Sequence, residues 1–136
     1  MHVFTYGTLM IPEVMAAVTA GRFPSRPADL PGYVRYRVRD ESYPGIVPAA
    51  GEIVSGVLYL DVTAAALARL DRFEGDLYER TAVTVRFENE TGLPAATYII
   101  HAAHRNRLTS EPWDLEAFRR DHLAGFLRNY QGFSVL

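Results

Sequence analysis

Alternating apolar and polar residues predict several strands along the chain. From Gly32 to Arg39, arginine alternates with valine and tyrosine at a period of two, which is typical of a half-exposed strand. Residues 53–60 are apolar on both faces and indicate a strand in the middle of the core, where Gly56 marks a bulge or a barrel bend. Residues 79–101 alternate on either side of the turn residues 89–92, which predicts a hairpin.

Three further segments have helical spacing. Residues 12–20 begin with proline and are followed by Gly21, as expected at the two ends of a short helix. Thr63 is a suitable cap for a helix over residues 64–73, and a last helix is expected from about residue 114 to residue 130. The apolar stripes of these two helices comprise Leu67, Leu70 and Phe73, and Leu115, Phe118, His122, Phe126 and Tyr130.

Runs of strands interrupted by single helices predict an α+β fold, in which a small mixed β-barrel carries flanking helices. Pro24, Pro27 and Pro31 are expected to break up the segment before the first long strand. The sequence contains no internal repeat, low-complexity tract or linker. We therefore expect a single domain over residues 1–136.

Composition narrows the classes of function. The chain has no cysteine, so disulfides, thiolate nucleophiles and cysteine-ligated metal sites are excluded. A formal net charge of −2 gives no electrostatic reason to expect nucleic acid or an anionic membrane as a partner. The N-terminus lacks a basic region followed by a long apolar run, and no apolar stretch is long enough to span a bilayer. We expect a soluble, cytoplasmic protein.

The first candidate for chemistry lies near the N-terminus, where an apolar strand runs into Tyr6, Gly7, Thr8 and Leu9. A strand that stops at Gly7 leaves main-chain N–H groups without ladder partners, and glycine allows a ligand to approach the backbone closely. Such a turn can hold an anion, with the Thr8 hydroxyl as a further donor. The alternative interpretation is an ordinary exit from a strand into a loop.

The second candidate is Glu74, which precedes Gly75 at the expected C-terminus of a helix. The helix macrodipole disfavours a carboxylate there, and an apolar setting favours the protonated form. The alternative is a solvated helix-end carboxylate. Asp71 lies on the same helical face, and such a pair can indicate glycoside hydrolysis. Because pairs three residues apart are common on exposed helices, we expect Asp71 instead to pair with Arg69 or Arg72 or to cap locally.

Other polar residues have competing structural interpretations. The Tyr78 hydroxyl is expected to point into a pocket beside the glutamate, with packing of its ring as the alternative, whereas for Tyr98 core packing is favoured over a place in the pocket. Arg80 is expected to form a structural salt bridge. His101 and His104 would lie on opposite faces of a strand with no acidic ligand nearby, so we expect no metal site.

Three arginines, one histidine and the tryptophan are the remaining residues with a possible role in function or packing. Arg35, Arg37 and Arg39 form a basic strand face, which can guide an acidic ligand or simply protect an edge. His122 lies on the apolar stripe of the last helix and is expected to be a hydrogen-bonded core residue. Trp113 is expected to anchor that helix.

The two blocks around Gly7 and Glu74, with residues 30–33 (Leu-Pro-Gly-Tyr) and 43–47 (Tyr-Pro-Gly-Ile-Val) between them, resemble the γ-glutamylcyclotransferase-like family. This family includes the γ-glutamylamine cyclotransferases and the plant avirulence-induced proteins, and the likeness covers nearly the whole chain. It implies a barrel with a pocket at one end, where the N-terminal loop meets the glutamate's helix. It also implies that Glu74 is the catalytic glutamate and that residues 6–9 form a main-chain cradle.

The resemblance implies a cofactor-free reaction of the transferase, acyltransferase or lyase type. The α-amine of a γ-glutamyl amine or peptide attacks its own side-chain amide and releases 5-oxoproline, and one glutamate serves as general acid and base. Substrate binding is then expected from Tyr6, Gly7, Thr8, Leu9, Tyr78 and Tyr98. The rivals are a non-catalytic module that binds a small carboxylate or amino-acid derivative, and an interaction protein that uses the Arg35–Arg39 face. Neither the leaving group nor the oligomeric state is indicated by the sequence.

Overall fold

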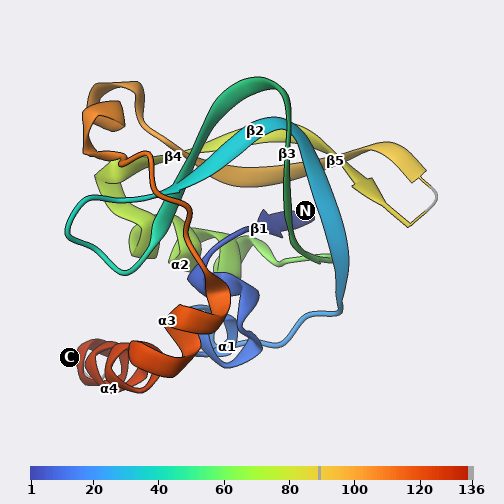
Figure 1. The fold of residues 1–136 in the computed structure, drawn as a ribbon. Helices are drawn as coiled ribbons and strands as arrows, with labels where there is room; N and C mark the ends of the chain where they lie inside the picture. Colours follow the sequence, from blue (N-terminus) through green and yellow to red (C-terminus); the bar gives the residue numbers. More distant parts are fainter. Residues whose placement is uncertain (89, 135–136) are drawn as a thin grey trace.

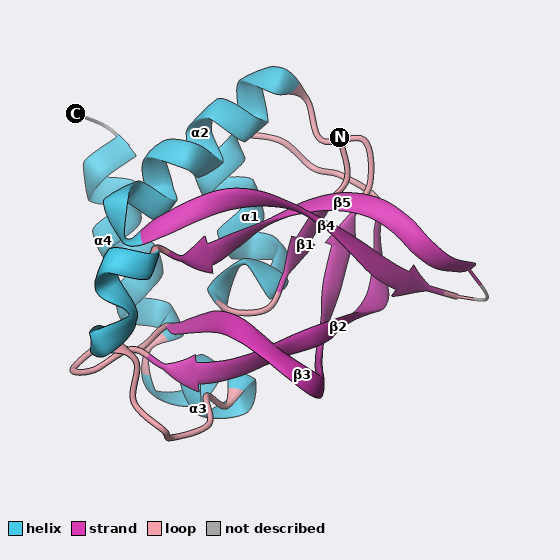
Figure 2. Cartoon of the chain, turned by 90° about the horizontal axis from the view of Figure 1, so that it is seen from above, coloured by secondary structure: helices cyan, strands magenta, loops and turns pink. Residues whose placement is uncertain are grey.

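The computed structural model describes residues 1–88 and 90–134. A closed barrel lies at its centre, with strands in the order β1-β3-β2-β4-β5, and α1, α2 and α4 gather on one side of it (Figures 1 and 2). This arrangement confirms the predicted α+β barrel with flanking helices. The strands are β1 (Val3–Thr5), β2 (Ser25–Arg37), β3 (Pro44–Tyr59), β4 (Tyr78–Phe87) and β5 (Glu90–Ile100). The helices are α1 (Pro12–Thr19), α2 (Ala64–Glu74), α3 (Leu115–Asp121) and α4 (Leu123–Ser134), with short 3₁₀ helices η1 (Thr8–Met10), η2 (Gly75–Leu77) and η3 (Ala102–Arg107).

The barrel is mixed because β1 pairs antiparallel with β3 and parallel with β5. Contrary to expectation, the proline-containing segment is regular, since β2 begins at Ser25 and includes Pro27 and Pro31. Both prolines lie in register with β3, whereas β4 pairs with β2 at one position, Asp29 with Arg86. On the side that faces β4, β2 therefore resembles an edge strand, and an edge strand tolerates proline, which has no N–H to donate.

Gly56 does not mark a bulge, which was one of the two roles expected for it. The register shift lies in β2, between Pro31 and Tyr33, where Gly32 has a φ of +85°. Gly56 instead allows β3 and β1 to approach each other, because a Cβ atom there would clash with the Thr5 carbonyl oxygen. The glycine within the strand pattern thus marks a position where no side chain fits, and the reason is close packing between neighbouring strands.

The first two helices pack over one side of the barrel. The expected cap of α2 is confirmed, since the Thr63 hydroxyl accepts a 3.2 Å hydrogen bond from the Ala66 N–H. Leu67 and Leu70 of α2 are buried in one apolar cluster with residues of α1. Helix α1 ends at Thr19, one residue earlier than expected, and Ala20, with a φ of 58°, provides the left-handed cap. None of the helices in the described ranges is both long and apolar enough to span a bilayer.

The expected last helix is two helices, α3 and α4, separated by His122. The backbone of His122 leaves helical geometry (φ −131°, ψ −19°), although its N–H still donates to Phe118 and its carbonyl accepts from Phe126. The break leaves His122 exposed, which corrects its expected place in the core. The side chain of Tyr130 lies outside the described residues.

Trp113 anchors this C-terminal part of the chain, as expected. Its side chain is buried, its Nε1 donates a 2.7 Å hydrogen bond to the Ser42 carbonyl, and its ring lies 6.0 Å from that of Phe118. Because Ser42 belongs to the connection between β2 and β3, Trp113 fixes the start of α3 to the barrel.

Candidate active site

A cavity of about 250 Å³ opens at the end of the barrel where β1 stops and β4 begins. All seven residues predicted to form the site lie on its wall, although they come from four different elements and one loop. These residues are Tyr6, Gly7, Thr8, Leu9, Glu74, Tyr78 and Tyr98. The structure thus brings together the two sequence blocks that lie about half the chain apart.

The loop after β1 folds into a tight turn. The carbonyls of Gly7 and Thr8 accept hydrogen bonds of 3.0 and 3.2 Å from the N–H groups of Met10 and Ile11. The N–H groups of Thr8 and Leu9 are the first in this 3₁₀ turn, and such groups have no acceptor within it. They are therefore available to an acceptor in the cavity.

Side chains from the barrel bind the remaining two carbonyls of the loop. Arg35 Nη1 donates a 2.7 Å hydrogen bond to the Tyr6 carbonyl, and the Tyr59 hydroxyl donates a 2.7 Å hydrogen bond to the Leu9 carbonyl. All four carbonyls from Tyr6 to Leu9 thus accept hydrogen bonds from the protein. This arrangement holds the turn in place while the N–H groups at its start stay available.

Gly7 is required by packing rather than by a left-handed backbone. Its φ is −133°, which other residues also adopt. A Cβ atom at this position, however, would lie 2.8 Å from Cγ and Cδ of Pro44. Gly7 and Pro44, from two of the blocks that carry the family resemblance, are therefore matched to each other at the cavity wall.

The basic face expected from Arg35 to Arg39 is occupied by contacts within the chain. In addition to its bond to the N-terminal loop, Arg35 lies over the Trp113 ring, 5.6 Å from its centroid. Arg37 forms an ion pair with Glu111 at 2.8 Å, and Arg39 donates to the Asn106 carbonyl. These arginines stabilise loops around the cavity, which leaves little support for a free basic surface.

Glu74 is the last residue of α2 and borders the cavity. Gly75 follows it with a φ of +66°, a conformation that favours glycine at a helix end. Within the described part of the chain, no side chain or main-chain group forms a hydrogen bond or an ion pair with the Glu74 carboxyl group. Burial raises the pKa of Glu74 from 4.5 to about 8, although part of the side chain remains exposed. Such a carboxyl group can accept and donate a proton near neutral pH.

Tyrosines surround this carboxyl group. Burial raises the pKa of Tyr6 and Tyr78 well above 10, and the negative charge of Glu74 contributes to both shifts. The pKa of Tyr98 is raised by burial first and by its hydrogen bond to Asp71 second. All three therefore remain neutral hydroxyls at physiological pH.

The hydroxyl protons of these tyrosines are directed to acceptors other than Glu74. Tyr78, which was expected to point its hydroxyl into the pocket beside the glutamate, lines the cavity but donates a 2.6 Å hydrogen bond to the Pro44 carbonyl. Tyr6 donates to the Tyr98 carbonyl, also at 2.6 Å. The tyrosine rings thus form the cavity wall, and their hydroxyls tie its elements together.

Asp71 has a different environment from Glu74. Its Oδ1 accepts a 2.6 Å hydrogen bond from the Tyr98 hydroxyl, and its Oδ2 lies 3.5 Å from Arg80 Nη1. The expected pairing of Asp71 with Arg69 or Arg72 is therefore wrong, whereas a structural salt bridge of Arg80 is confirmed. Asp71 is paired and does not line the cavity, so the two carboxyl groups cannot act as a glycosidase pair there.

The two histidines expected in a strand lie instead at η3. His101 caps this 3₁₀ helix, with its Nδ1 accepting from the Ala103 N–H, and its ring lies 6.1 Å from that of His104. In the ranges 1–88 and 90–134, no group of three or more His, Asp or Glu side chains is placed to hold a metal ion.

The cavity wall also contains residues that were not predicted as site residues, among them Tyr43, Arg107 and Phe126. Tyr43 comes from the connection before β3, Arg107 from the end of η3, and Phe126 from α4. Tyr43 belongs to a block that carries the family resemblance, so that block was a usable signal. Arg107 lies in a polar loop and Phe126 was assigned to an apolar stripe, and neither pattern indicates a cavity.

A closed barrel whose end cavity joins a protonatable carboxyl group to a turn with available N–H groups defines a small-molecule site. The family described as "Gamma-glutamyl cyclotransferase, AIG2-like" matches residues 3–115, and the chain belongs to this family. Protein AIG2 C of Arabidopsis thaliana is 33% identical over 131 residues, which cover 96% of this chain and 79% of the relative.

Solved structures share the fold. A protein of Arabidopsis thaliana known from a solution structure superimposes with a TM-score of 0.72 at 31% identity, covering 97% of this chain and 80% of that chain. A γ-glutamyl cyclotransferase superimposes with a TM-score of 0.69 at 14% identity, covering 96% of this chain and 85% of that one, which shows the fold alone.

Proposed function

We propose that this protein is a cofactor-free γ-glutamyl cyclotransferase, which releases 5-oxoproline from a γ-glutamyl amine or peptide with Glu74 as general acid and base. The observation that carries this proposal is a carboxyl group with a pKa of about 8, without a protein partner among the described residues, on the same cavity as a turn whose first N–H groups have no acceptor within the turn. Membership of the γ-glutamyl cyclotransferase, AIG2-like family supports it.

In the proposed complex, the α-carboxylate of the substrate accepts hydrogen bonds from the N–H groups of Thr8 and Leu9. The α-ammonium group then faces Glu74. A positive charge close to the carboxyl group favours its ionised form, so substrate binding lowers the pKa of Glu74 towards neutrality. The bound substrate therefore converts Glu74 into the base that the first step requires.

Cyclisation proceeds within one bound molecule. Glu74 takes a proton from the α-ammonium group, and the freed nitrogen attacks the γ-carbonyl carbon to form the ring C–N bond. Glu74 then returns this proton to the departing nitrogen as the original amide C–N bond breaks, and the second proton lost by the ring nitrogen passes through Glu74 to the departing amine in the same way. Over the reaction the α-nitrogen loses two protons and the departing amine, leaving as ammonium, gains two, so the reaction balances without water or a cofactor.

The direct test is to replace Glu74 with glutamine, which keeps the size of the side chain but cannot exchange a proton. Release of 5-oxoproline is measured across a panel of γ-glutamyl amines and peptides. We expect turnover to fall by about 10² to 10⁴-fold while binding is retained. Glu79→Gln is the matched control, because Glu79 is exposed on β4 and does not line the cavity. Equal turnover in the wild type and the Glu74→Gln variant would refute the assigned role.

A second candidate function is binding without turnover, which one observation favours. At neutral pH a carboxyl group with a pKa of about 8 is mostly protonated, and in that form it donates a hydrogen bond to a carboxylate ligand. For a module that binds a small carboxylate or an amino-acid derivative, this hydrogen bond would be sufficient and no proton transfer would be needed. Binding of γ-glutamyl compounds with no 5-oxoproline from any member of the panel would identify this function.

A further inference from the structure

The cavity has one charged side chain that the proposed reaction does not use. Among its described wall residues, Arg107 carries the sole positive charge and Glu74 the sole negative charge. The Arg107 side chain is exposed and forms no ion pair with a described acidic residue. A cation placed on the wall of a small-molecule cavity points to an anionic group on the ligand.

The backbone of Arg107 is fixed although its side chain is free. Its carbonyl accepts a 2.7 Å hydrogen bond from the Arg39 N–H, and the next residue, Leu108, forms a β-bridge with Val38. The Thr109 N–H donates to the Arg37 carbonyl at 2.9 Å. Residues 107–109 therefore run beside the end of β2 like an added strand, which places Arg107 at a defined position on the cavity.

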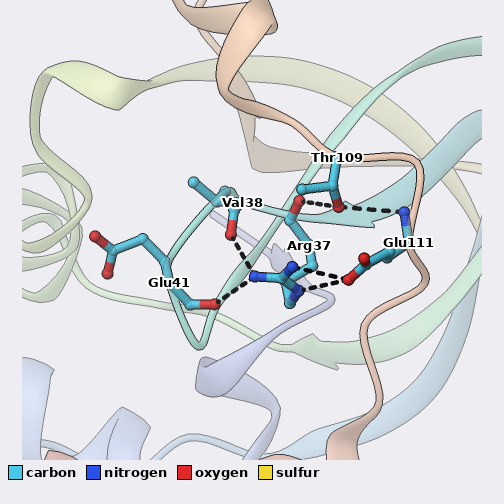
Figure 3. A network of polar contacts seen from close by, with 5 residues as sticks. All are labelled: Arg37, Val38, Glu41, Thr109 and Glu111. Atoms are coloured by element: carbon cyan, nitrogen blue, oxygen red, sulfur yellow. Dashed lines mark hydrogen bonds and ion pairs between the residues drawn. The ribbon is translucent and has the colours of Figure 1, made fainter.

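Arg37 joins the two segments that carry Tyr43 and Arg107 (Figure 3). Its guanidinium group binds the Glu111 carboxylate at 2.8 Å on one side, and the carbonyls of Val38 and Glu41 at 3.3 and 3.4 Å on the other. The two segments that carry Tyr43 and Arg107 are thus linked to each other through Arg37.

The charge of Arg107 acts on Tyr43, another residue of the cavity wall. Burial and the nearby carboxylate of Glu41 raise the pKa of Tyr43, whereas the positive charge of Arg107 lowers it. The Tyr43 hydroxyl therefore lies in the fields of both Arg107 and Glu41. Glu41 is the acidic side chain nearest in effect to Tyr43, and its carboxylate points away from Arg37 in Figure 3.

We infer that Arg107 determines specificity by selecting γ-glutamyl compounds whose leaving amine carries a carboxylate, that is, γ-glutamyl amino acids and peptides. This inference rests on the proposed function, in which the turn at Thr8 binds the α-carboxylate and Glu74 faces the α-nitrogen. The leaving group then lies against the remaining wall, where Tyr43 and Phe126 provide rings and Arg107 provides a charge. A leaving group with a positive charge is disfavoured by the same guanidinium group.

The test compares two ligands of nearly equal size, γ-glutamylglycine and γ-glutamylglycinamide, which differ in the charge of the leaving group. Binding to the Glu74→Gln protein is measured by calorimetry, so that turnover does not interfere. We expect the acid to bind about tenfold more tightly than the amide, because a charge-assisted hydrogen bond at an exposed site retains part of its strength. Added salt should reduce this preference.

Replacing Arg107 with glutamine in that background should abolish the preference by weakening the acid alone, and Arg107→Lys should restore part of it. Arg105→Gln is the control, because Arg105 belongs to the same 3₁₀ helix but does not line the cavity. An unchanged preference in the Arg107→Gln variant, equal weakening of both ligands, or binding of neither ligand would overturn the inference. Selective binding by a wild-type protein that forms no 5-oxoproline would instead refute the proposed reaction and leave the role of Arg107 standing.

Discussion

The Tyr98 hydroxyl donates a 2.6 Å hydrogen bond to Asp71, one helical turn before Glu74. The same helix face therefore carries one carboxylate that is bound by the protein and one that is available to a ligand. Asp71 also pairs with Arg80 and lies outside the cavity, so its charge is compensated. We interpret Asp71 as the residue that fixes the end of α2 to β5, and Glu74 as the residue that this contact positions.

Replacing Tyr98 with phenylalanine should weaken that attachment. The variant loses the hydrogen bond to Asp71, and we expect the free energy of unfolding to fall by about 1 kcal/mol. Urea denaturation of Tyr98→Phe, Asp71→Asn and the double variant measures the coupling between the two residues. Tyr33→Phe is the control, because the structure gives the Tyr33 hydroxyl no hydrogen bond to another described residue. Additive effects of the two substitutions would contradict the attachment.

Gly7→Ala should disturb the cavity more than it disturbs the fold. The added methyl group would lie 2.8 Å from two ring carbons of Pro44, so the turn or the proline must shift. Overpacking of this kind costs about 1 to 3 kcal/mol of stability, and the displaced N–H groups should no longer bind a carboxylate. Ligand affinity and thermal unfolding report the two effects separately.

Gly125→Ala provides the comparison for that experiment. A Cβ atom at Gly125, in α4, meets only the end of the Arg128 side chain, at 3.7 Å. Because alanine is the better helix former, this substitution should leave stability unchanged or raise it by up to about 1 kcal/mol. If Gly7→Ala behaved in the same way as Gly125→Ala, the close match between Gly7 and Pro44 would have no functional consequence.

The sequence predicted those site residues that have a local signal, and it did not predict contacts between residues far apart in the chain. Gly7 and Glu74 stand out locally, because one interrupts a strand and the other opposes a helix dipole, and the cavity contains both. The acceptor of the Tyr78 hydroxyl is a carbonyl 34 residues away, which no local pattern specifies. Arg107 reaches the cavity through a β-bridge between Val38 and Leu108, a tertiary contact of the same kind.

Similar reasons explain the errors in secondary structure. Pro27 and Pro31 oppose a regular strand, and β2 accepts them because its pairing with β4 is confined to one position. The helical spacing across His122 is genuine, since its main-chain hydrogen bonds to Phe118 and Phe126 persist through the break. Periodicity reports these local hydrogen bonds but not the change of direction between α3 and α4.

The last prediction concerns the dependence of stability on pH. The pKa of Glu74 is about 8 in the folded protein and 4.5 in an exposed glutamate, so the folded state binds this proton more tightly. Its contribution to stability is complete below pH 4.5 and decreases as the pH rises, until it is lost near pH 8. The Glu74→Gln variant, which cannot ionise, should therefore gain stability relative to the wild type between pH 5 and pH 9. The gain should be at most a few kcal/mol, because the cavity admits solvent to part of the side chain.

Urea unfolding at several pH values measures this difference, and the Glu79→Gln profile should follow that of the wild type. Parallel profiles for the wild type and the Glu74→Gln variant would show that Glu74 ionises freely in the folded protein, which would remove the physical basis for its role as a general acid near neutral pH.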